Sequence, residues 1–188
     1  MGLFTKGLQS LRTQGLLYTF ISFMKFIKYN IDKKYCEKTA RQTVETVGSD
    51  LHIKPPTNLT NKTQLGDNVN FNGMRISGGG KVIIGDNFHS GTECLIMTQN
   101  HNYDNGSAIP YDDTYITRDV SIGDNVWLGS RVTILPGVTI EEGAVIQAGS
   151  TVTKDIPKGA IAGGHPVEVF KSRNMEHYED HKSENNFH

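Results

Sequence analysis

The sequence predicts an all-β solenoid with a short helical appendage at its N-terminus and a polar tail at its C-terminus. Three observations indicate this fold class. An aliphatic residue recurs every six positions from Ile122 to Val152, glycine makes up 20 of the 188 residues, and turn pairs such as Pro136-Gly137 separate the aliphatic positions. A helix needs a period near 3.6 and an isolated strand a period of 2. A period of six instead fits short strands joined by tight corners.

Residues 1–45 form an apolar and basic zone without proline. We expect one or two amphipathic helices between residues 8 and 34. Four apolar residues there have the i, i+3, i+4, i+7 spacing of one helix face: Phe20, Phe23, Met24 and Ile27. Two interpretations stay open. The segment caps the open end of the solenoid, as repeat proteins require, or its lysines bring it to an anionic membrane surface.

Residues 46–170 carry the repeat and form the predicted solenoid domain. Its inward positions in the most regular part are Ile122, Leu128, Ile134, Ile140, Ile146 and Val152. The residue four positions after each of these is small or β-branched, which suits a crowded interior. Two earlier stretches, 65–69 (LGDNV) and 84–88 (IGDNF), resemble 122–126 (IGDNV), so the same pattern occurs there too.

The repeat slips at two places. The step from Leu65 to Ile84 is one residue longer than three hexads, and we assign the extra residue to the glycines at 78–80. The step from Ile84 to Ile122 is two residues longer than six hexads. We assign that slip to residues 99–118, which lose the repeat and read as a loop ejected from the solenoid. Insertions on one face of a repeat scaffold are often functional.

The remaining zone, residues 171–188, is polar and rich in histidine, and we expect a short helix or a frayed tail. The net charge of −1 lacks the basic excess of a non-specific nucleic-acid binder, so no nucleic-acid partner is expected. Two cysteines, Cys36 and Cys94, form no disulfide framework and fit a reducing compartment. No apolar run approaches the roughly 18 residues of a bilayer span. These features predict a cytoplasmic protein, and the membrane interpretation would place it at the inner face of the membrane.

The repeat resembles that of the hexapeptide-repeat acyltransferases. Residues 122–130 (IGDNVWLGS), 149–157 (GSTVTKDIP) and 162–166 (AGGHP) are similar to the sugar O-acetyltransferase branch, which includes galactoside, maltose and xenobiotic acetyltransferases. The resemblance covers roughly residues 60–170. It implies a left-handed parallel β-helix, a homotrimer with active sites at subunit boundaries, and acetyl-CoA as co-substrate. It does not identify the acceptor.

Acyl transfer from a thioester to a hydroxyl needs a base for the hydroxyl proton and donors for the oxyanion. The resemblance implies that His101, at the start of the ejected loop, is the base, and an imidazole suits that task near neutral pH. Asp104 or a backbone carbonyl is the candidate to orient the ring. Asn100 is a candidate contact to acceptor hydroxyls. Each of the two also has a purely structural interpretation, as a turn or loop-capping residue.

The resemblance also implies a set of coenzyme A contacts. Small residues that match contact positions of the family are Ser130, Ala148 and Thr153, and Lys154 matches a basic residue near the phosphates. Trp127 matches a tryptophan beside the groove, although an aromatic residue at a subunit contact explains it as well. Lys171 and Arg173 can add positive charge for the phosphates. One departure weakens that part of the site, because the relatives place two arginines where this chain has Glu168 and Lys171.

The sequence thus predicts an acetyl-CoA-dependent O-acetyltransferase acting on a sugar or polysaccharide precursor. N-acetylation of an amino sugar and a non-catalytic β-helix scaffold are the alternatives. No metal site is expected, since His89, His101 and His165 are too scattered along the repeat to converge as zinc ligands.

Overall fold

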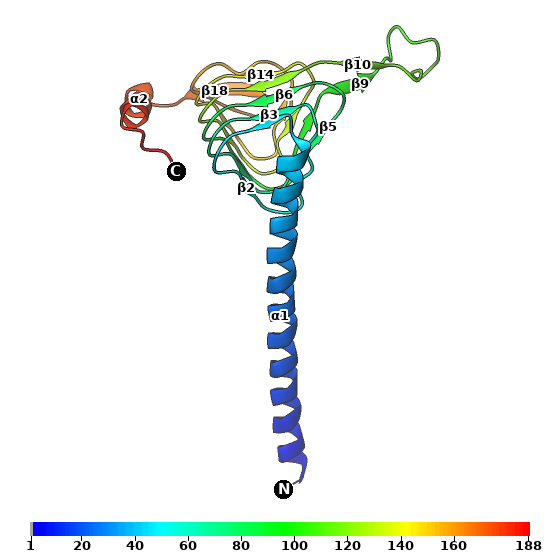
Figure 1. Cartoon of the computed structure of the whole chain (residues 1–188), viewed down its shortest axis with the longest axis vertical. Helices are drawn as coiled ribbons and strands as arrows, with labels where there is room; N and C mark the ends of the chain where they lie inside the picture. Colours follow the sequence, from blue (N-terminus) through cyan, green and yellow to red (C-terminus); the bar gives the residue numbers. More distant parts are fainter. Residues whose placement is uncertain (1) are drawn as a thin grey trace. The chain divides into compact units, whose positions relative to one another are not determined.

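The computed structural model describes the backbone of residues 2–188 and the side chains of residues 17–188. The chain divides into two compact units, Met1–Tyr35 and Cys36–His188. The first lies within a single long helix, α1 (Gly2–Thr43), where the sequence predicted one or two helices. The second begins with the last turns of α1 and contains all strands (Figure 1).

The second unit is a parallel β-solenoid of about six turns, which confirms the predicted fold class. Its strands build three sheets, which we call A, B and C. Sheet A contains β1 (Thr46–Val47), β3 (Thr63–Leu65), β6 (Val82–Ile84), β11 (Val120–Ile122) and β14 (Thr139–Ile140). Sheet B contains β2 (His52–Ile53), β4 (Asn70–Phe71), β7 (His89–Ser90), β12 (Trp127–Leu128), β15 (Val145–Ile146), β17 (Ala160–Gly163) and β18 (Glu168–Ser172). Sheet C contains β5 (Met74–Ser77), β8 (Cys94–Met97), β13 (Thr133–Ile134) and β16 (Thr151–Val152).

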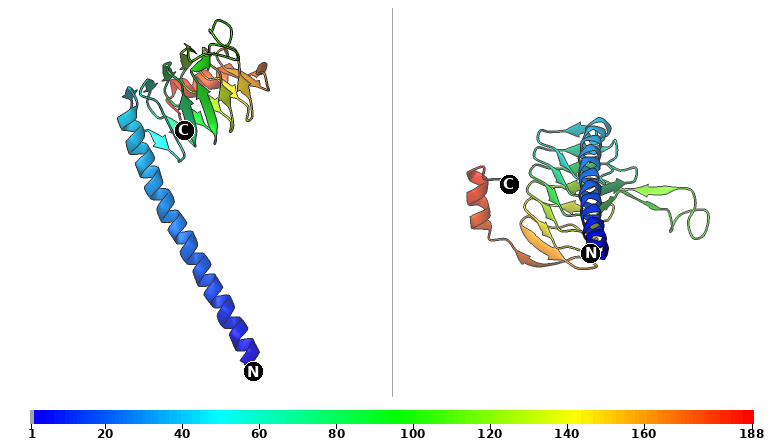
Figure 2. Two further views of the ribbon diagram at one scale, coloured as in Figure 1. Left: turned by 90° about the vertical axis from the view of Figure 1, so that its right-hand side faces the viewer. Right: turned by 90° about the horizontal axis from the view of Figure 1, so that it is seen from below.

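One regular coil takes three hexads, because Ile122 lies in register with Ile140 on the neighbouring strand. Ile84 also lies directly beside Ile122. A single coil of 18 residues therefore separates these two residues, and the other 20 of the 38 residues in the step (38 − 18) are inserted. The insertion leaves the solenoid as an antiparallel hairpin of β9 (Gln99–His101) and β10 (Tyr115–Thr117), which confirms the ejected loop. Figures 1 and 2 show this hairpin projecting away from the coils.

The first slip lies where the sequence predicted it. The step from Asn58 to its partner Arg75 is one residue shorter than three hexads, whereas the step from Thr63 to its partner Val82 is one residue longer. The extra residues therefore lie between 75 and 82, around the glycines at 78–80. Gly78 has a positive φ of 110°, a conformation that glycine adopts without strain.

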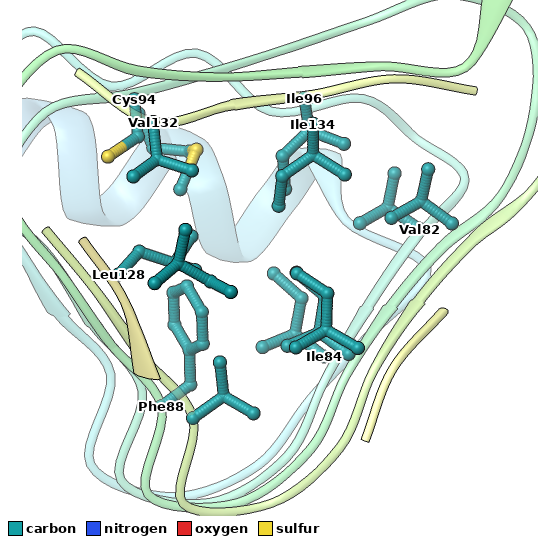
Figure 3. Close-up of a cluster of buried hydrophobic side chains, with 14 of the residues drawn as sticks. Val82, Ile84, Phe88, Cys94, Ile96, Leu128, Val132 and Ile134 are labelled. Atoms are coloured by element: carbon teal, nitrogen blue, oxygen red, sulfur yellow. The ribbon is translucent and has the colours of Figure 1, made fainter. Parts of the chain in front are cut away.

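The interior is a stack of aliphatic side chains, one from each side of every coil. All six inward positions predicted from Ile122 to Val152 are at most 1% exposed. Figure 3 shows Leu128 pointing into this interior beside Phe88, and Ile134 pointing into it next to Ile96. At the first coil, Ala40 of α1 is buried in the same core and Cys36 packs against it. Within the residues that the structure describes, no helix is long and apolar enough to cross a membrane.

The Gly-Asp-Asn motifs stack at the corner between sheets A and B. Asn68, Asn87 and Asn125 have positive φ values of 52°, 54° and 59°. Asparagine tolerates this left-handed region better than most residues. The Nδ2 of Asn68 donates to Oδ1 of Asn87 (2.9 Å), and the Nδ2 of Asn87 donates to Oδ1 of Asn125 (3.0 Å). The three side chains thus form a ladder that runs along the solenoid.

The aspartate of each motif accepts a backbone hydrogen bond from the coil before it. The amide of Asp67 donates to Asp86 (2.7 Å) and the amide of Asp86 donates to Asp124 (2.8 Å). A Cβ on Gly85 would collide with the Asp124 carboxylate and with the adjoining backbone. The motif therefore needs all three residue types, each for a different physical reason.

The chain ends with α2 (Met175–Ser183), which confirms the short C-terminal helix. The side chain of Asn174 caps it by accepting from the amide of His177 (3.2 Å). The Tyr178 hydroxyl accepts from Asn125 (2.9 Å) and donates to Glu142 (2.9 Å), so α2 is tied to the end of the asparagine ladder. Burial, followed by the Glu142 hydrogen bond, raises the pKa of Tyr178 to about 12.

We expect Asn87→Ala to lower the free energy of unfolding by about 2 kcal/mol, because it loses the ladder bonds and places alanine in the left-handed region, which asparagine tolerates better. Asn87→Gly loses the same side-chain bonds but tolerates the backbone conformation, so it should be less destabilised. Urea denaturation followed by circular dichroism measures both. If both variants lost the same unfolding free energy, backbone strain would make no contribution to the instability of Asn87→Ala.

Candidate active site

The hairpin of β9 and β10 leaves the solenoid at the corner between sheets C and A. It follows β8 of sheet C and returns the chain to β11 of sheet A. His101 is the last residue of β9 and lies in register with Tyr115 of β10. The fold therefore presents this histidine on an arm outside the packed prism.

Two tyrosines pack against the His101 ring. The Tyr111 ring stacks on it with centroids 3.8 Å apart and an interplanar angle of 21°, and the Tyr115 ring lies 4.6 Å away at 38°. The Nδ1 atom of His101 is buried and has no hydrogen-bond partner among the described residues 17–188. Buried polar atoms are nearly always paired, so an unpaired one marks a place that calls for an explanation.

The other two hairpin candidates lie close to His101 in sequence. Asn100 is exposed and lies in register with Ile116 of β10. Asp104 is exposed in the turn that follows β9. No hydrogen bond joins Asp104 to His101 in the described part of the chain, and the roles of both candidates stay predictions.

Asp112 organises the irregular part of the loop, which sequence reasoning missed. Its carboxylate accepts from the Ser107 amide (2.8 Å) and from the amide (2.9 Å) and hydroxyl (2.5 Å) of Thr114. The Thr114 hydroxyl and these amides lower the pKa of Asp112 to about 2. Tyr111 is its direct neighbour, so this carboxylate holds the segment that covers His101. No repeat or spacing in the sequence signals these contacts.

The coenzyme candidates with small side chains lie on two corners of the prism. Ser130 and Ala148 occupy equivalent places, one coil apart, between sheets B and C. Thr153 and Lys154 follow β16 at the corner between sheets C and A, where the hairpin leaves two coils earlier. Sheet C separates the two groups, so a single chain does not bring all four residues together.

Lys154 and Glu168 form a salt bridge, with Nζ and Oε2 2.7 Å apart. Both side chains are at least half exposed. Glu168 is the residue that departs from the two-arginine pattern, and here its carboxylate compensates the charge of the lysine expected near the phosphates. The departure at 168 therefore also affects the predicted phosphate contact of Lys154.

Trp127 and Lys171 line a cavity of about 700 Å³ between sheet B and the C-terminal segment. Two other cations at this cavity have partners. The Nε of Arg173 donates to the Gly143 carbonyl (2.6 Å), and Lys182 pairs with Glu142. The sequence placed Lys171 and Arg173 together as phosphate contacts, but the structure gives Arg173 a structural bond as well.

The last residue of the chain covers one side of this cavity. The His188 ring stacks on His89 with centroids 5.6 Å apart, and its carbonyl oxygen lies 3.2 Å from His89 Nε2. Burial is the main cause that lowers the pKa of His89. Within the described residues, no three histidine, cysteine, aspartate or glutamate side chains come together as metal ligands.

Comparisons with known proteins place this architecture in a family. The sequence pattern of the bacterial transferase hexapeptide family (six repeats) matches residues 119–154. A galactoside acetyltransferase in complex with coenzyme A is 32% identical, with a TM-score of 0.65 over 76% of this chain and 72% of that one. The chain belongs to the hexapeptide-repeat acetyltransferase family.

Two further solved structures of this family are similar over most of their length. A hexapeptide-repeat acetyltransferase of Vibrio cholerae O1 biovar eltor, complexed with acetyl coenzyme A, is 27% identical with a TM-score of 0.63 over 73% of this chain and 77% of that chain. A maltose O-acetyltransferase of Clostridium difficile 630 is 27% identical with a TM-score of 0.53 over 78% of this chain and 87% of that chain. No curated protein matches the sequence.

We expect Asp112→Ala to loosen the loop and to release Tyr111 from the His101 ring, because four hydrogen bonds to the carboxylate are lost. Amide hydrogen exchange at residues 103–114 should speed up by at least about tenfold. The exposed neighbour Asp113→Ala is the matched control and should exchange like the wild type. Unchanged exchange in Asp112→Ala would contradict this role.

The same loop should respond to pH in the wild-type protein. Protection of the amides at residues 103–114 should persist above pH 4 and disappear as pH falls toward 2, because the Asp112 carboxyl group, whose pKa is lowered, stabilises the loop only while it is ionised.

Proposed function

We propose that the protein transfers an acetyl group from acetyl-CoA to a hydroxyl of a sugar or polysaccharide precursor, with His101 as general base. The observation that carries this proposal is the histidine on the ejected hairpin, with two tyrosine rings packed against it and a buried ring nitrogen without a partner among the described residues. The names of the relatives support the chemistry, because they include galactoside and maltose acetyltransferases and a complex with acetyl-CoA.

In the proposed reaction, His101 accepts the proton of the acceptor hydroxyl through Nε2 as the oxygen attacks the thioester carbonyl. A carbon–oxygen bond forms, the carbon–sulfur bond breaks, and the imidazolium returns its proton to the departing coenzyme A thiolate. Nδ1 keeps the other ring proton and donates it to a hydrogen-bond acceptor that does not belong to the described residues of this chain. Backbone amides beside the groove stabilise the oxyanion. The tyrosine rings restrict the imidazole to one orientation, which favours proton transfer.

The placement of the coenzyme candidates favours a homotrimer with shared sites. Ser130 and Ala148 lie on a different corner from the hairpin, with sheet C between them. A neighbouring subunit packed against that face would bring its own corner to the hairpin of the first. His101 of one subunit would then face a groove of the next, and a neighbouring group could pair with Nδ1.

The identity of the acceptor is the part of the proposed reaction that the geometry constrains least. An amino sugar would be acetylated on nitrogen by the same base and the same groove. We favour the hydroxyl because two of the solved relatives described above are named for galactoside and maltose acetylation. A scaffold without catalysis would have no use for an imidazole kept in a fixed orientation on an arm.

We expect His101→Ala to reduce acetyl transfer by 10²–10⁴-fold, roughly the contribution of general base catalysis, while acetyl-CoA binding stays within about twofold of the wild type. Thiol release on a panel of sugars measures the first and calorimetric titration the second.

The exposed histidine His52→Ala, on the second strand of the solenoid, is the control and should keep full activity. Full activity of His101→Ala would remove the base assignment. No acetyl-CoA binding by the wild type would favour the scaffold alternative.

We also expect Glu168→Gln to tighten coenzyme A binding about two- to fivefold, because it frees Lys154 from an exposed salt bridge. The gain should shrink as salt concentration rises, since exposed charges are screened. Glu37→Gln removes a comparable exposed partner of Arg41 at the other end of the solenoid and should change nothing. Equal affinity of Glu168→Gln and wild type across salt concentrations would show that Lys154 does not contact the phosphates.

A further inference from the structure

The helix α1 exposes bulky apolar side chains between residues 17 and 35. Phe20, Phe23, Phe26 and Ile31 are 57–65% exposed. Bulky apolar side chains that are exposed together mark a surface that contacts a partner. The helix is described well beyond this stretch, so the exposure does not come from a chain end.

These side chains form a broad stripe. At 100° per residue, Phe20, Met24, Ile27 and Ile31 share one face, and Phe23 and Phe26 widen it along one side. The stripe is wider than the two-position seam of a coiled coil and contains aromatic residues of the kind that enter a membrane interface.

The same segment concentrates positive charge. The segment contains four lysines and one aspartate, which give a net charge of +3. These residues are Lys25, Lys28, Lys33, Lys34 and Asp32. The whole chain has a net charge of −1, so the remaining residues together carry −4. Residues 1–16 add Lys6 and Arg12 and no acidic residue, so residues 1–35 carry +5 and residues 36–188 carry −6.

A second copy of the helix is a poorer occupant than an anionic surface. In a coiled coil that used Leu17, Phe20, Met24, Ile27 and Ile31 as its seam, the next seam position would be Lys34. The lysines of parallel copies would repel one another, and Phe23 and Phe26 would still face water. An anionic surface instead attracts the lysines and accepts the aromatic residues.

We propose that residues 17–35 form an amphipathic anchor that lies on the surface of an anionic lipid bilayer. Apolar side chains of the stripe enter the boundary between headgroups and acyl chains. Lys28 and Lys33, at the two edges of the stripe, extend their ammonium groups to the lipid phosphates. The helix lies on the bilayer and does not span it, in keeping with the absence of a helix apolar enough for spanning among the described residues.

The test is vesicle flotation of the full-length protein with phosphatidylcholine alone and with phosphatidylcholine mixed with phosphatidylglycerol. We expect the protein to float with the mixed vesicles, to stay below with phosphatidylcholine alone, and to be released by high salt. The readout is binding and needs no acceptor, so its outcome is independent of the proposed acetyl transfer.

Two pairs of substitutions separate the apolar and the electrostatic parts. Phe20→Gln with Phe23→Gln should reduce the partition coefficient by at least about 100-fold, since each phenylalanine loses its burial. Lys28→Gln with Lys33→Gln should reduce it roughly 30-fold on the mixed vesicles. The matched control, Lys54→Gln with Lys81→Gln, removes two exposed lysines from the solenoid and should float like the wild type.

Three results would overturn the proposal. Wild-type protein that stays below with both kinds of vesicle shows that there is no anchor. Equal flotation with and without phosphatidylglycerol contradicts an anionic partner. A smaller assembly mass of the phenylalanine variant in the absence of lipid, with no flotation of the wild type, assigns the stripe to contacts between copies of the chain. Circular dichroism and acetyl-CoA binding report whether each variant keeps its fold.

Discussion

The stacked glycine, aspartate and asparagine corner is the interaction on which the rest of the structure depends. Asp86 and Asn87 bond to Asp124 and Asn125 although the whole hairpin insertion lies between them in the sequence. The ladder therefore closes the solenoid across the insertion, and the hairpin can leave without disturbing the coils on either side. At its other end, Asn125 bonds to Tyr178 and so fixes the helix that walls the cavity. One set of side-chain contacts thus joins the coils on both sides of the arm that carries the candidate base and ties down α2, which lies at the opposite side of the prism (Figure 2).

The solenoid could be predicted because its contacts repeat. Each inward aliphatic residue meets its equivalent three hexads later, so a local pattern reports a tertiary contact. The distance from Ile84 to Ile122 could not be interpreted in the same way. A count of residues does not distinguish two loose coils from one coil with an inserted hairpin, and only the pairing of β6 with β11 decides it. The strands of the hairpin, 99–101 and 115–117, have no alternation of apolar and polar residues that would reveal their pairing.

The candidate site likewise contains residues that the sequence predicted and residues that it did not. His101 was predicted because it stands at a break in the repeat beside a motif that resembles known acetyltransferases. Tyr111 and Asp112 were missed because their contacts depend on the path of an irregular loop, which no periodicity describes. The salt bridge of Lys154 with Glu168 joins two residues that the sequence had singled out separately. Their meeting follows from the fold, since β16 and β18 both lie at the last coil.

The geometry of a triangular prism separates the candidate coenzyme residues of one chain. Successive hexads step from one sheet to the next, so Ser130 and Ala148 share a corner while Thr153, further along the same coil, lies on the following one. The hairpin leaves from that following corner, and sheet C stands between it and Ser130. No rearrangement within the rigid coils removes this separation. The proposed trimer answers this separation, because residues that act together across sheet C then come from different chains.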